Sequence, residues 1–138
     1  MIDEIMNAIS QKLYSLFGDG YEIYKNSIEQ DLQEPCFLIS LVSADKKPMM
    51  GTGSFRILPF DILFFPSRGE TQCHEVTEIL MDELEYIDVK GDVMAGTKMR
   101  SEIVDDTLHF FVNYDFTIFR KKEETFMEML ETTNGIKE

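Results

Sequence analysis

The chain has 138 residues, of which 43% are hydrophobic, and its formal net charge is −13. This length predicts one domain with its own core, and the hydrophobic content is typical of a globular protein rather than a disordered one. Acidic residues outnumber basic ones by 26 to 13. This excess disfavours a protein that holds nucleic acid or an anionic membrane, because lysine and arginine bind phosphate groups.

The two cysteines, Cys36 and Cys73, form no dense framework, which favours a reducing compartment. The first ten residues have neither the basic region nor the apolar stretch of a signal peptide. The longest aliphatic and aromatic run, residues 62–65, is far too short to span a bilayer. We therefore expect a soluble protein that is cytosolic where it is made.

The first part of the chain predicts one helix and two strands. Hydrophobic residues recur every three to four positions in residues 2–17, which predicts an amphipathic helix that ends at Gly18. Residues 21–28 alternate loosely between apolar and polar, which indicates a strand. Residues 36–42 are almost continuously apolar and predict a central strand that is covered on both faces.

A less regular segment follows. Residues 43–54 contain proline and glycine and little periodicity, so they are predicted to form a long loop or the tip of a hairpin. Residues 55–65 predict a further strand. Pro59 within it indicates either an edge position or a bend, because proline cannot donate a hydrogen bond to a neighbouring strand.

The second half of the chain predicts a helix and a hairpin. Residues 70–87 carry an apolar stripe with helical spacing, and residues 89–98 give a weaker signal. Residues 108–119 alternate over twelve positions, which predicts a long strand. Together with residues 99–104 this strand is expected to form a hairpin that turns at residues 105–107.

The order of these elements predicts an α+β fold: a mainly antiparallel sheet with two helices packed on one face and a long C-terminal hairpin. Residues 1–120 are expected to form a single α+β domain. Residues 121–138 are expected to form a C-terminal extension, with a short helix at 123–132 and then a frayed end.

Few residues combine into a recognisable catalytic pattern. Cys73 and His74 are neighbours, but adjacent helical residues point about 100° apart, so the thiol is expected to pack inward beside an exposed histidine. Two acidic residues and a histidine near a turn can bind a metal ion, although aspartate is also common in turns. The candidate metal ligands in this region are Glu102, Asp105, Asp106 and His109.

Two surface features allow more than one interpretation. The helix predicted at residues 70–87 carries a row of acidic residues, which is either a solvated face or a wall that repels another polyanion. The row consists of Glu75, Glu78, Asp82 and Glu85. The second face of the long strand carries Phe111 and Phe119 among polar groups. This face either lies under one of the protein's own helices or forms an interface between subunits.

Two segments, "RILPFDILFFPS" and "LHFFVNYDFTIF", resemble a family of small phage tail terminator proteins from prophages of Gram-positive bacteria. The matching residues are Arg56, 59–62 and 65–66 in the first segment and 109–115 in the second. The opening, residues 1–42, is similar to the same family, so the resemblance covers nearly the whole chain. One departure is Gly53, where the family pattern leads us to expect a bulkier residue.

The resemblance implies a non-enzymatic α+β subunit of a ring, commonly a hexamer, on the head-proximal end of a tail tube. Such a ring stops the addition of tube protein and offers a surface to the head connector. The implied partners are further copies of the chain, the tail tube protein and the head–tail connector protein. The resemblance implies no catalytic residue, metal or cofactor. It also implies neither specific nucleic-acid binding nor contact with a membrane. The implied locations are the host cytoplasm during assembly and the virion tail.

Residues 43–54 and 123–130 are the segments that we expect to make contacts along the ring axis, where methionines are adaptable contact residues. The residues that we predict to form interfaces are Met49, Met50, Phe111, Phe119, Phe126 and Met127. The acidic row is a possible lining of the lumen. The alternatives are another head–tail connector or a minor tail protein, a small metal-dependent hydrolase, and a module that binds a small ligand.

Overall fold

The computed structural model describes residues 1–25 and 33–119, and the chain divides into two compact units. The larger unit consists of residues Met1–Ala44 and Leu58–Asp115. The smaller unit consists of Asp45–Ile57 and Phe116–Glu138, and its description ends at residue 119. The predicted helix at 123–132 and the extension at 121–138 lie outside the described residues, and a single domain over 1–120 stays a prediction.

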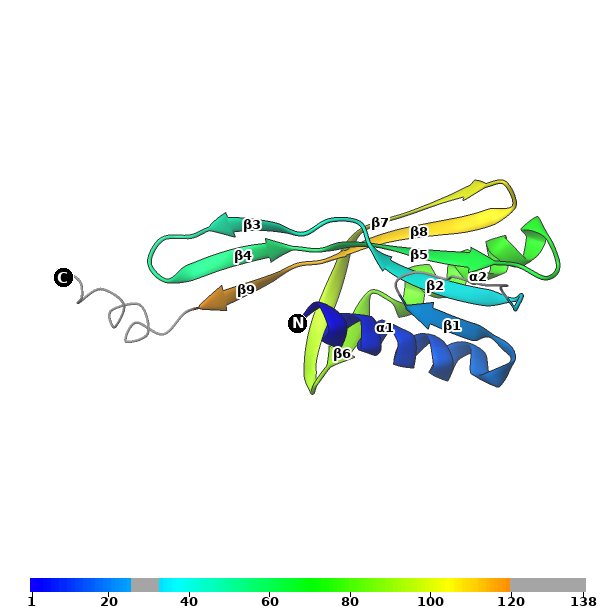
Figure 1. Cartoon of the computed structure of the whole chain (residues 1–138), viewed down its shortest axis with the longest axis horizontal. Coiled ribbons are helices and arrows are strands. Elements are labelled where there is room, and N and C mark those ends of the chain that lie inside the picture. Colours follow the sequence, from blue (N-terminus) through cyan, green and yellow to red (C-terminus); the bar gives the residue numbers. More distant parts are fainter. Residues whose placement is uncertain (26–32, 120–138) are drawn as a thin grey trace. The chain divides into compact units, whose positions relative to one another are not determined.

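The larger unit contains two helices and a six-stranded sheet in the order β1-β2-β5-β8-β7-β6 (Figure 1). Its elements are α1 (Ile2–Phe17), the 3-10 turn Gly18–Gly20, β1 (Glu22–Lys25), β2 (Cys36–Leu41), β5 (Pro59–Phe65), α2 (Glu70–Glu83), β6 (Tyr86–Val89), β7 (Asp92–Val104) and β8 (Thr107–Tyr114). Among the described strands of this unit, β1 and β2 pair in parallel and the other neighbours pair antiparallel. The predicted α+β class and the mainly antiparallel sheet are therefore confirmed.

One face of this sheet forms the core, because apolar residues alternate along its central strands. The buried side chains of β5 are Phe60, Ile62 and Phe64, and those of β8 are Leu108, Phe110, Val112 and Tyr114. The ring of Phe17 at the end of α1 lies 5.0 Å from the ring of Phe37 on this face. The hydroxyl of Tyr114 donates a 2.6 Å hydrogen bond to the carbonyl of Leu84, directly after α2.

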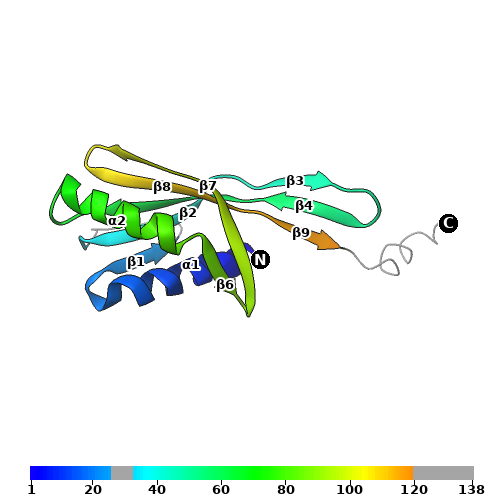
Figure 2. The same cartoon turned by 180° about the vertical axis from the view of Figure 1, so that it is seen from behind.

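The two helices end differently from each other. Helix α1 covers the predicted range and ends at Gly18, whose φ of 79° suits glycine. Helix α2 ends at Glu83 rather than at Ile87, and it lies along β8 and β7 (Figure 2). Its prediction ran too long because Ile87 continues the helical spacing, although Tyr86–Val89 alternates as a strand and pairs with β7.

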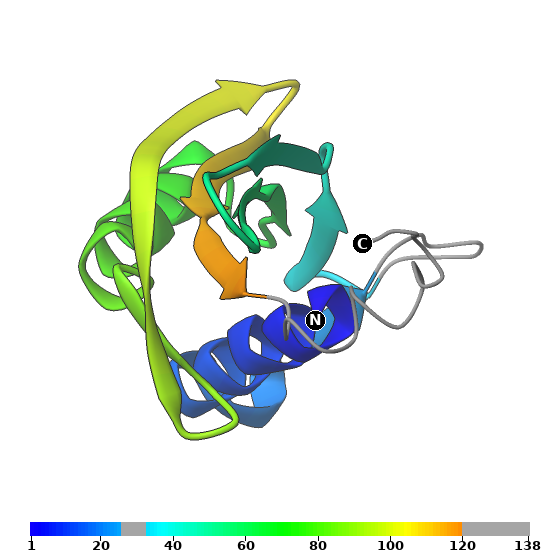
Figure 3. The ribbon, with the colours of Figure 1, turned by 90° about the vertical axis from the view of Figure 1, so that its left-hand side faces the viewer.

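Strand β7 is much longer than the predicted strand at 99–104 and bends along its length. Its register shifts between Thr97 and Arg100, where Lys98 has a φ of 53°. Such an irregularity increases strand twist. Figure 3 shows β7 curving from β8 toward α1, where β6 contacts the helix. Gly96 interrupts the alternation of apolar residues in this strand, so the sequence pattern did not predict its full length.

The smaller unit contains a three-stranded antiparallel sheet in the order β3-β4-β9. Its strands are β3 (Asp45–Pro48), β4 (Gly53–Ile57) and β9 (Phe116–Phe119). Strand β3 therefore lies within the segment that was predicted as a loop or hairpin tip. The predicted strands at 55–65 and 108–119 are each divided, at Leu58 and at Asp115, between β4 and β5 and between β8 and β9.

Of the two alternatives for Pro59, the edge position is wrong, because Pro59 begins β5, which lies between β2 and β8. The predicted strand is instead interrupted next to Pro59, which agrees with the alternative of a bend. One expectation about β2 was also wrong. In β2, Phe37 and Ile39 are buried, but Leu38 on the other face is only half-buried. The expected burial of both faces is not observed, because a continuous apolar run does not distinguish one covered face from two.

Candidate interaction surfaces

The face of the sheet opposite the core carries a chain of polar and aromatic contacts. Asp61 Oδ2 lies 3.0 Å from His109 Nδ1, and the His109 ring stacks on Phe111 at a centroid distance of 6.1 Å. The guanidinium of Arg100 lies 4.4 Å from the centre of the Phe111 ring, and Arg100 also donates to Glu102 at 2.8 Å. Cation–π and charged contacts of this kind fix side chains in place.

Among the described residues, the helices contact the core side of the sheet, so neither of these two helices covers Phe111. It is half-buried and points to the opposite side from Phe110 and Val112. Leu38, Leu63 and Phe65 are also half-buried, and register places Leu63 beside Leu38 and His109. A partly covered apolar face with organised polar groups is typical of a surface that contacts another protein.

One polar atom on this face has no partner within the described residues. Asp61 Oδ1 is buried, yet no hydrogen-bond donor of the described chain reaches it. The side chain of Asp61 is 16% exposed. Leaving a buried carboxylate oxygen without a donor is costly.

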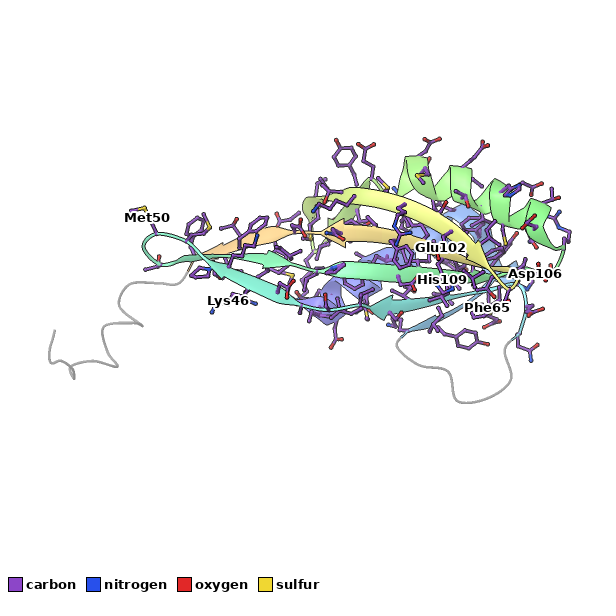
Figure 4. The ribbon with its side chains drawn as sticks, turned by 90° about the horizontal axis from the view of Figure 1, so that it is seen from above. Lys46, Met50, Phe65, Glu102, Asp106 and His109 are labelled. Atoms are coloured by element: carbon purple, nitrogen blue, oxygen red, sulfur yellow. The ribbon has the colours of Figure 1, made fainter. Side chains whose placement is uncertain are left out.

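The smaller unit presents a second surface, which we call the ribbon face: Lys47, Met49, Gly53, Phe55 and Phe119. Register and alternation place these residues on one side of β3, β4 and β9. Phe119 is 70% exposed, and Met50 at the tip is 97% exposed. Figure 4 shows Met50 and Lys46 in this unit.

The structure explains the unexpected glycine in this unit. A Cβ atom added to Gly53 would lie 2.9 Å from the Cε1 atom of Phe119. Gly53 therefore leaves room for the Phe119 ring, which lies over the backbone of the neighbouring strand. The glycine allows a large aromatic ring to remain at the surface of the ribbon face.

Charge is divided unevenly between the two units. The larger unit contains six basic and 20 acidic residues, and the smaller unit contains seven basic and six acidic residues, which gives formal charges of −14 and +1. Within the described part of the smaller unit, Lys46, Lys47 and Arg56 outnumber Asp45. The acidity of the chain therefore belongs to the larger unit.

The acidic row is exposed along its whole length, at Glu75, Glu78 and Asp82 on α2 and at Glu85 just after it. Glu75 pairs with Arg68 at 3.3 Å. The other three carboxylates have no ion-pair partner among residues 1–25 and 33–119. The side chain of Ile79, between them in sequence, is 38% exposed. Whether this row lines a lumen stays a prediction.

The four candidate metal ligands do not come together as one site. His109 contacts Asp61, and Glu102 contacts Arg100 (Figure 4). Asp105 and Asp106 form the turn between β7 and β8 with φ angles of 52° and 62°. In the part of the chain that the structure describes, no three His, Cys, Asp or Glu side chains are grouped to hold a metal ion.

The two cysteines are buried, and His74 is exposed, which confirms the prediction for Cys73 and His74. Burial raises the pKa of Cys73, and nearby carboxylates act in the same direction. Burial raises the pKa of Cys36 from 9.0 to about 11, with smaller contributions from the charges of Glu34 and Glu22. Both thiols are therefore protonated and poorly nucleophilic at neutral pH.

The raised pKa of Cys36 predicts a loss of stability in base. A thiol whose pKa is higher in the folded state than in the unfolded state stabilises the fold fully below pH 9 and loses this contribution as the pH rises through about 11. Urea unfolding at pH 8 and pH 10.5 should show this decrease, and Cys36→Ala should reduce it. Part of the decrease in stability should remain in Cys36→Ala, because burial also raises the pKa of Tyr114. An identical decrease in Cys36→Ala would contradict the assignment.

A hollow of about 470 Å³ lies between α1 and β1. It is lined by Ser10, Gln11, Tyr14, Asp19, Tyr21, Glu22 and Ile23. The Tyr14 hydroxyl already donates to Asp19 at 2.6 Å. Histidine and cysteine are absent from this lining, so it offers no pair of a nucleophile and an imidazole base.

Among the described helices, none is both long enough and apolar enough to cross a membrane. Two surfaces of the described residues combine apolar and polar side chains. One is the sheet face opposite the core, which we call the open sheet face, and the other is the ribbon face. Surfaces of this kind are typical of a protein that works through contacts with other proteins.

The family model described as "Phage tail terminator protein" matches residues 4–126. The chain belongs to this family of phage structural proteins. No curated protein shows significant similarity to the chain. One solved protein structure is 11% identical, with a TM-score of 0.49, over 88% of this chain and 99% of that one. That similarity is too low to carry an argument.

Proposed function

We propose that the chain is a structural, non-enzymatic subunit of a homo-hexameric ring that caps the head-proximal end of the tail tube. The ring stops elongation of the tube and joins it to the head–tail connector. The observation that carries this proposal is the match to tail terminator proteins over residues 4–126. The chain would act in the host cytoplasm during assembly and then remain in the virion tail.

The surfaces of the chain support a ring. A cyclic assembly of six copies needs two different lateral surfaces, because each contact is heterologous. The contacts of Phe17 and Leu84 with the core side support the packing of both helices on one face of the sheet. That packing leaves the face with Phe111 for a partner, while Met49, Met50 and Phe119 provide a separate surface. Phe126 and Met127 remain proposed contacts outside the described residues.

The mechanism depends on the different shapes of the two sides of the ring. One side of the ring fits the last layer of tube protein, and its other side lacks the surface that recruits a further layer. A negative lumen lets DNA slide without being held. The carboxylates of Glu75, Glu78, Asp82 and Glu85 are our candidates for its lining where no neighbouring copy covers them. We propose no specific nucleic-acid binding and no membrane contact.

Two other roles compete with this one. A neighbouring head–tail connector or a minor tail protein would use similar surfaces. A metal-dependent hydrolase would need Glu102, Asp105, Asp106 and His109, and addition of Mg²⁺, Mn²⁺ or Zn²⁺ would then raise the melting temperature. The contact of His109 with Asp61 and the exposed turn at Asp105 do not favour such a site.

The test is polymerisation of the tail tube protein of the same phage in the presence of the purified chain. We expect substoichiometric chain to shorten the tubes and electron microscopy to show a six-subunit ring at one end. A connector would bind finished tubes without limiting their length. Tubes of unchanged length at equimolar chain would overturn the proposal.

A further inference from the structure

We propose that the ribbon face of one copy docks on helix α2 of the next copy, so that the contact joins the basic unit of one chain to the acidic unit of its neighbour. This inference rests on the proposed ring and names the contact that closes it. The occupant of the ribbon face is thus a second copy of this chain, and its docking segment is Glu75–Asp82.

The ribbon face has the chemistry of a docking surface. Phe119 is 70% exposed and Met49 is 44% exposed, and both lie beside Lys47 on the same side of the three-stranded sheet. Register places Asp45 on this same side and Lys46 on the opposite side of β3. Lys47 has no ion-pair partner within the described chain. An exposed aromatic ring beside a lysine without an ion-pair partner fits a partner that offers both apolar area and carboxylates.

Helix α2 offers that combination. Ile79 is 38% exposed, and Glu78 and Asp82 stand near it on the helix without an ion-pair partner in the described residues. On the open sheet face, by contrast, Asp61 and Glu102 already contact His109 and Arg100. Carboxylates without such contacts therefore favour α2 over the sheet face as the surface that receives Lys47.

The unequal charges of the two units also determine which units of neighbouring copies attract each other. Two larger units, at −14 each, repel one another, and two smaller units gain nothing from electrostatics. A smaller unit with its described lysines and arginine is attracted to a larger unit. The favoured contact is therefore head-to-tail, and such contacts close into rings when the rotation permits. Duplex DNA also attracts lysine, but the larger unit of the same chain would repel it.

The experiment exchanges charge between the two surfaces and measures association by native mass spectrometry and sedimentation. The ribbon variant is Lys47→Glu, and the helix variant is Glu78→Lys/Asp82→Lys. Each alone should associate at least tenfold more weakly than wild type, because like charges then face each other. An equimolar mixture should regain wild-type association with the two variants alternating, since each reversed surface meets its complement on the other copy.

A matched control separates this contact from net charge. Adding Glu78→Lys/Asp82→Lys to the ribbon variant should restore association, whereas adding Glu22→Lys/Asp92→Lys should not, although both additions change the charge equally. Glu22 and Asp92 are exposed and lie outside α2. Wild-type association should also weaken as salt concentration rises.

Each outcome decides between the two proposals. Wild-type rings without recovery in the mixture would overturn the contact and leave the ring. Recovery in the mixture with open chains or dimers only would support the contact and overturn the ring. A wild type that is monomeric at the highest concentration would overturn both. Binding of duplex DNA that is lost in the ribbon variant, with unchanged association, would assign the ribbon face to nucleic acid and overturn the contact.

Discussion

Phe37→Ala is expected to lower the free energy of unfolding by about 3–5 kcal/mol, which is the usual cost of removing a buried phenylalanine. Phe37 is fully buried, and its ring lies 5.0 Å from that of Phe17 and 4.9 Å from that of Phe64. Its loss removes contacts between α1 and two strands at once. Urea unfolding followed by circular dichroism measures the change.

The control for this prediction is Phe111→Ala, on the opposite face of the same sheet. Phe111 is half-buried and contacts Arg100 and His109 rather than a helix. Its replacement should cost no more than about 1.5 kcal/mol. Equal losses in the two variants would mean that the face carrying Phe111 is as fully packed as the core side.

The second large effect is expected at Gly96. A Cβ atom at this position would lie 2.7 Å from Val112 Cγ2 and 3.0 Å from the carbonyl oxygen of Leu84. The backbone of Gly96 cannot move away easily, because its N–H donates to the carbonyl of Glu85 at 2.7 Å. Gly96→Ala should therefore destabilise the fold by about 1–3 kcal/mol through overpacking.

Gly20→Ala is the matched control for Gly96→Ala. A Cβ atom at Gly20 meets nothing within 4 Å, and Gly20 is not among the glycines with positive φ. Alanine there should leave stability unchanged or raise it slightly, because it restricts the unfolded chain. Thermal unfolding of both variants gives the comparison, and a Gly96→Ala protein as stable as Gly20→Ala would contradict the close approach of β7 to the end of α2.

Helix α1, the α+β class and the inward packing of Cys73 could be predicted because each depends on the spacing of neighbouring residues. The division of 108–119 at Asp115 could not, since the alternation continues across it while the strand changes its partners. The length of β7 was hidden by Gly96, whose lack of a side chain is needed for packing between elements distant in sequence. Spacing within an element is local information, whereas strand partners are set by the whole fold.

The same limit applies to the candidate surfaces. Alternation drew attention to Phe111 and Phe119, but it gave no sign that Arg100 lies over one ring and that Gly53 makes room for the other. Lys46 and Lys47 were not predicted to belong to an interaction surface, because the chain as a whole is acidic. A charge count taken over separate segments would have marked this adjacent basic pair.

The breaks at Leu58 and Asp115 have a consequence for the order of folding. The smaller unit pairs Arg56 with Phe116, so its closure from an unfolded chain must bring together residues about 60 positions apart, at a high cost in loop entropy. Once Pro59 has paired with Asn113 in the larger unit, the remaining loop is only a few residues long. We therefore expect β4 and β9 to pair only after β5 and β8, and a growing chain to complete the ribbon face at the end of its folding.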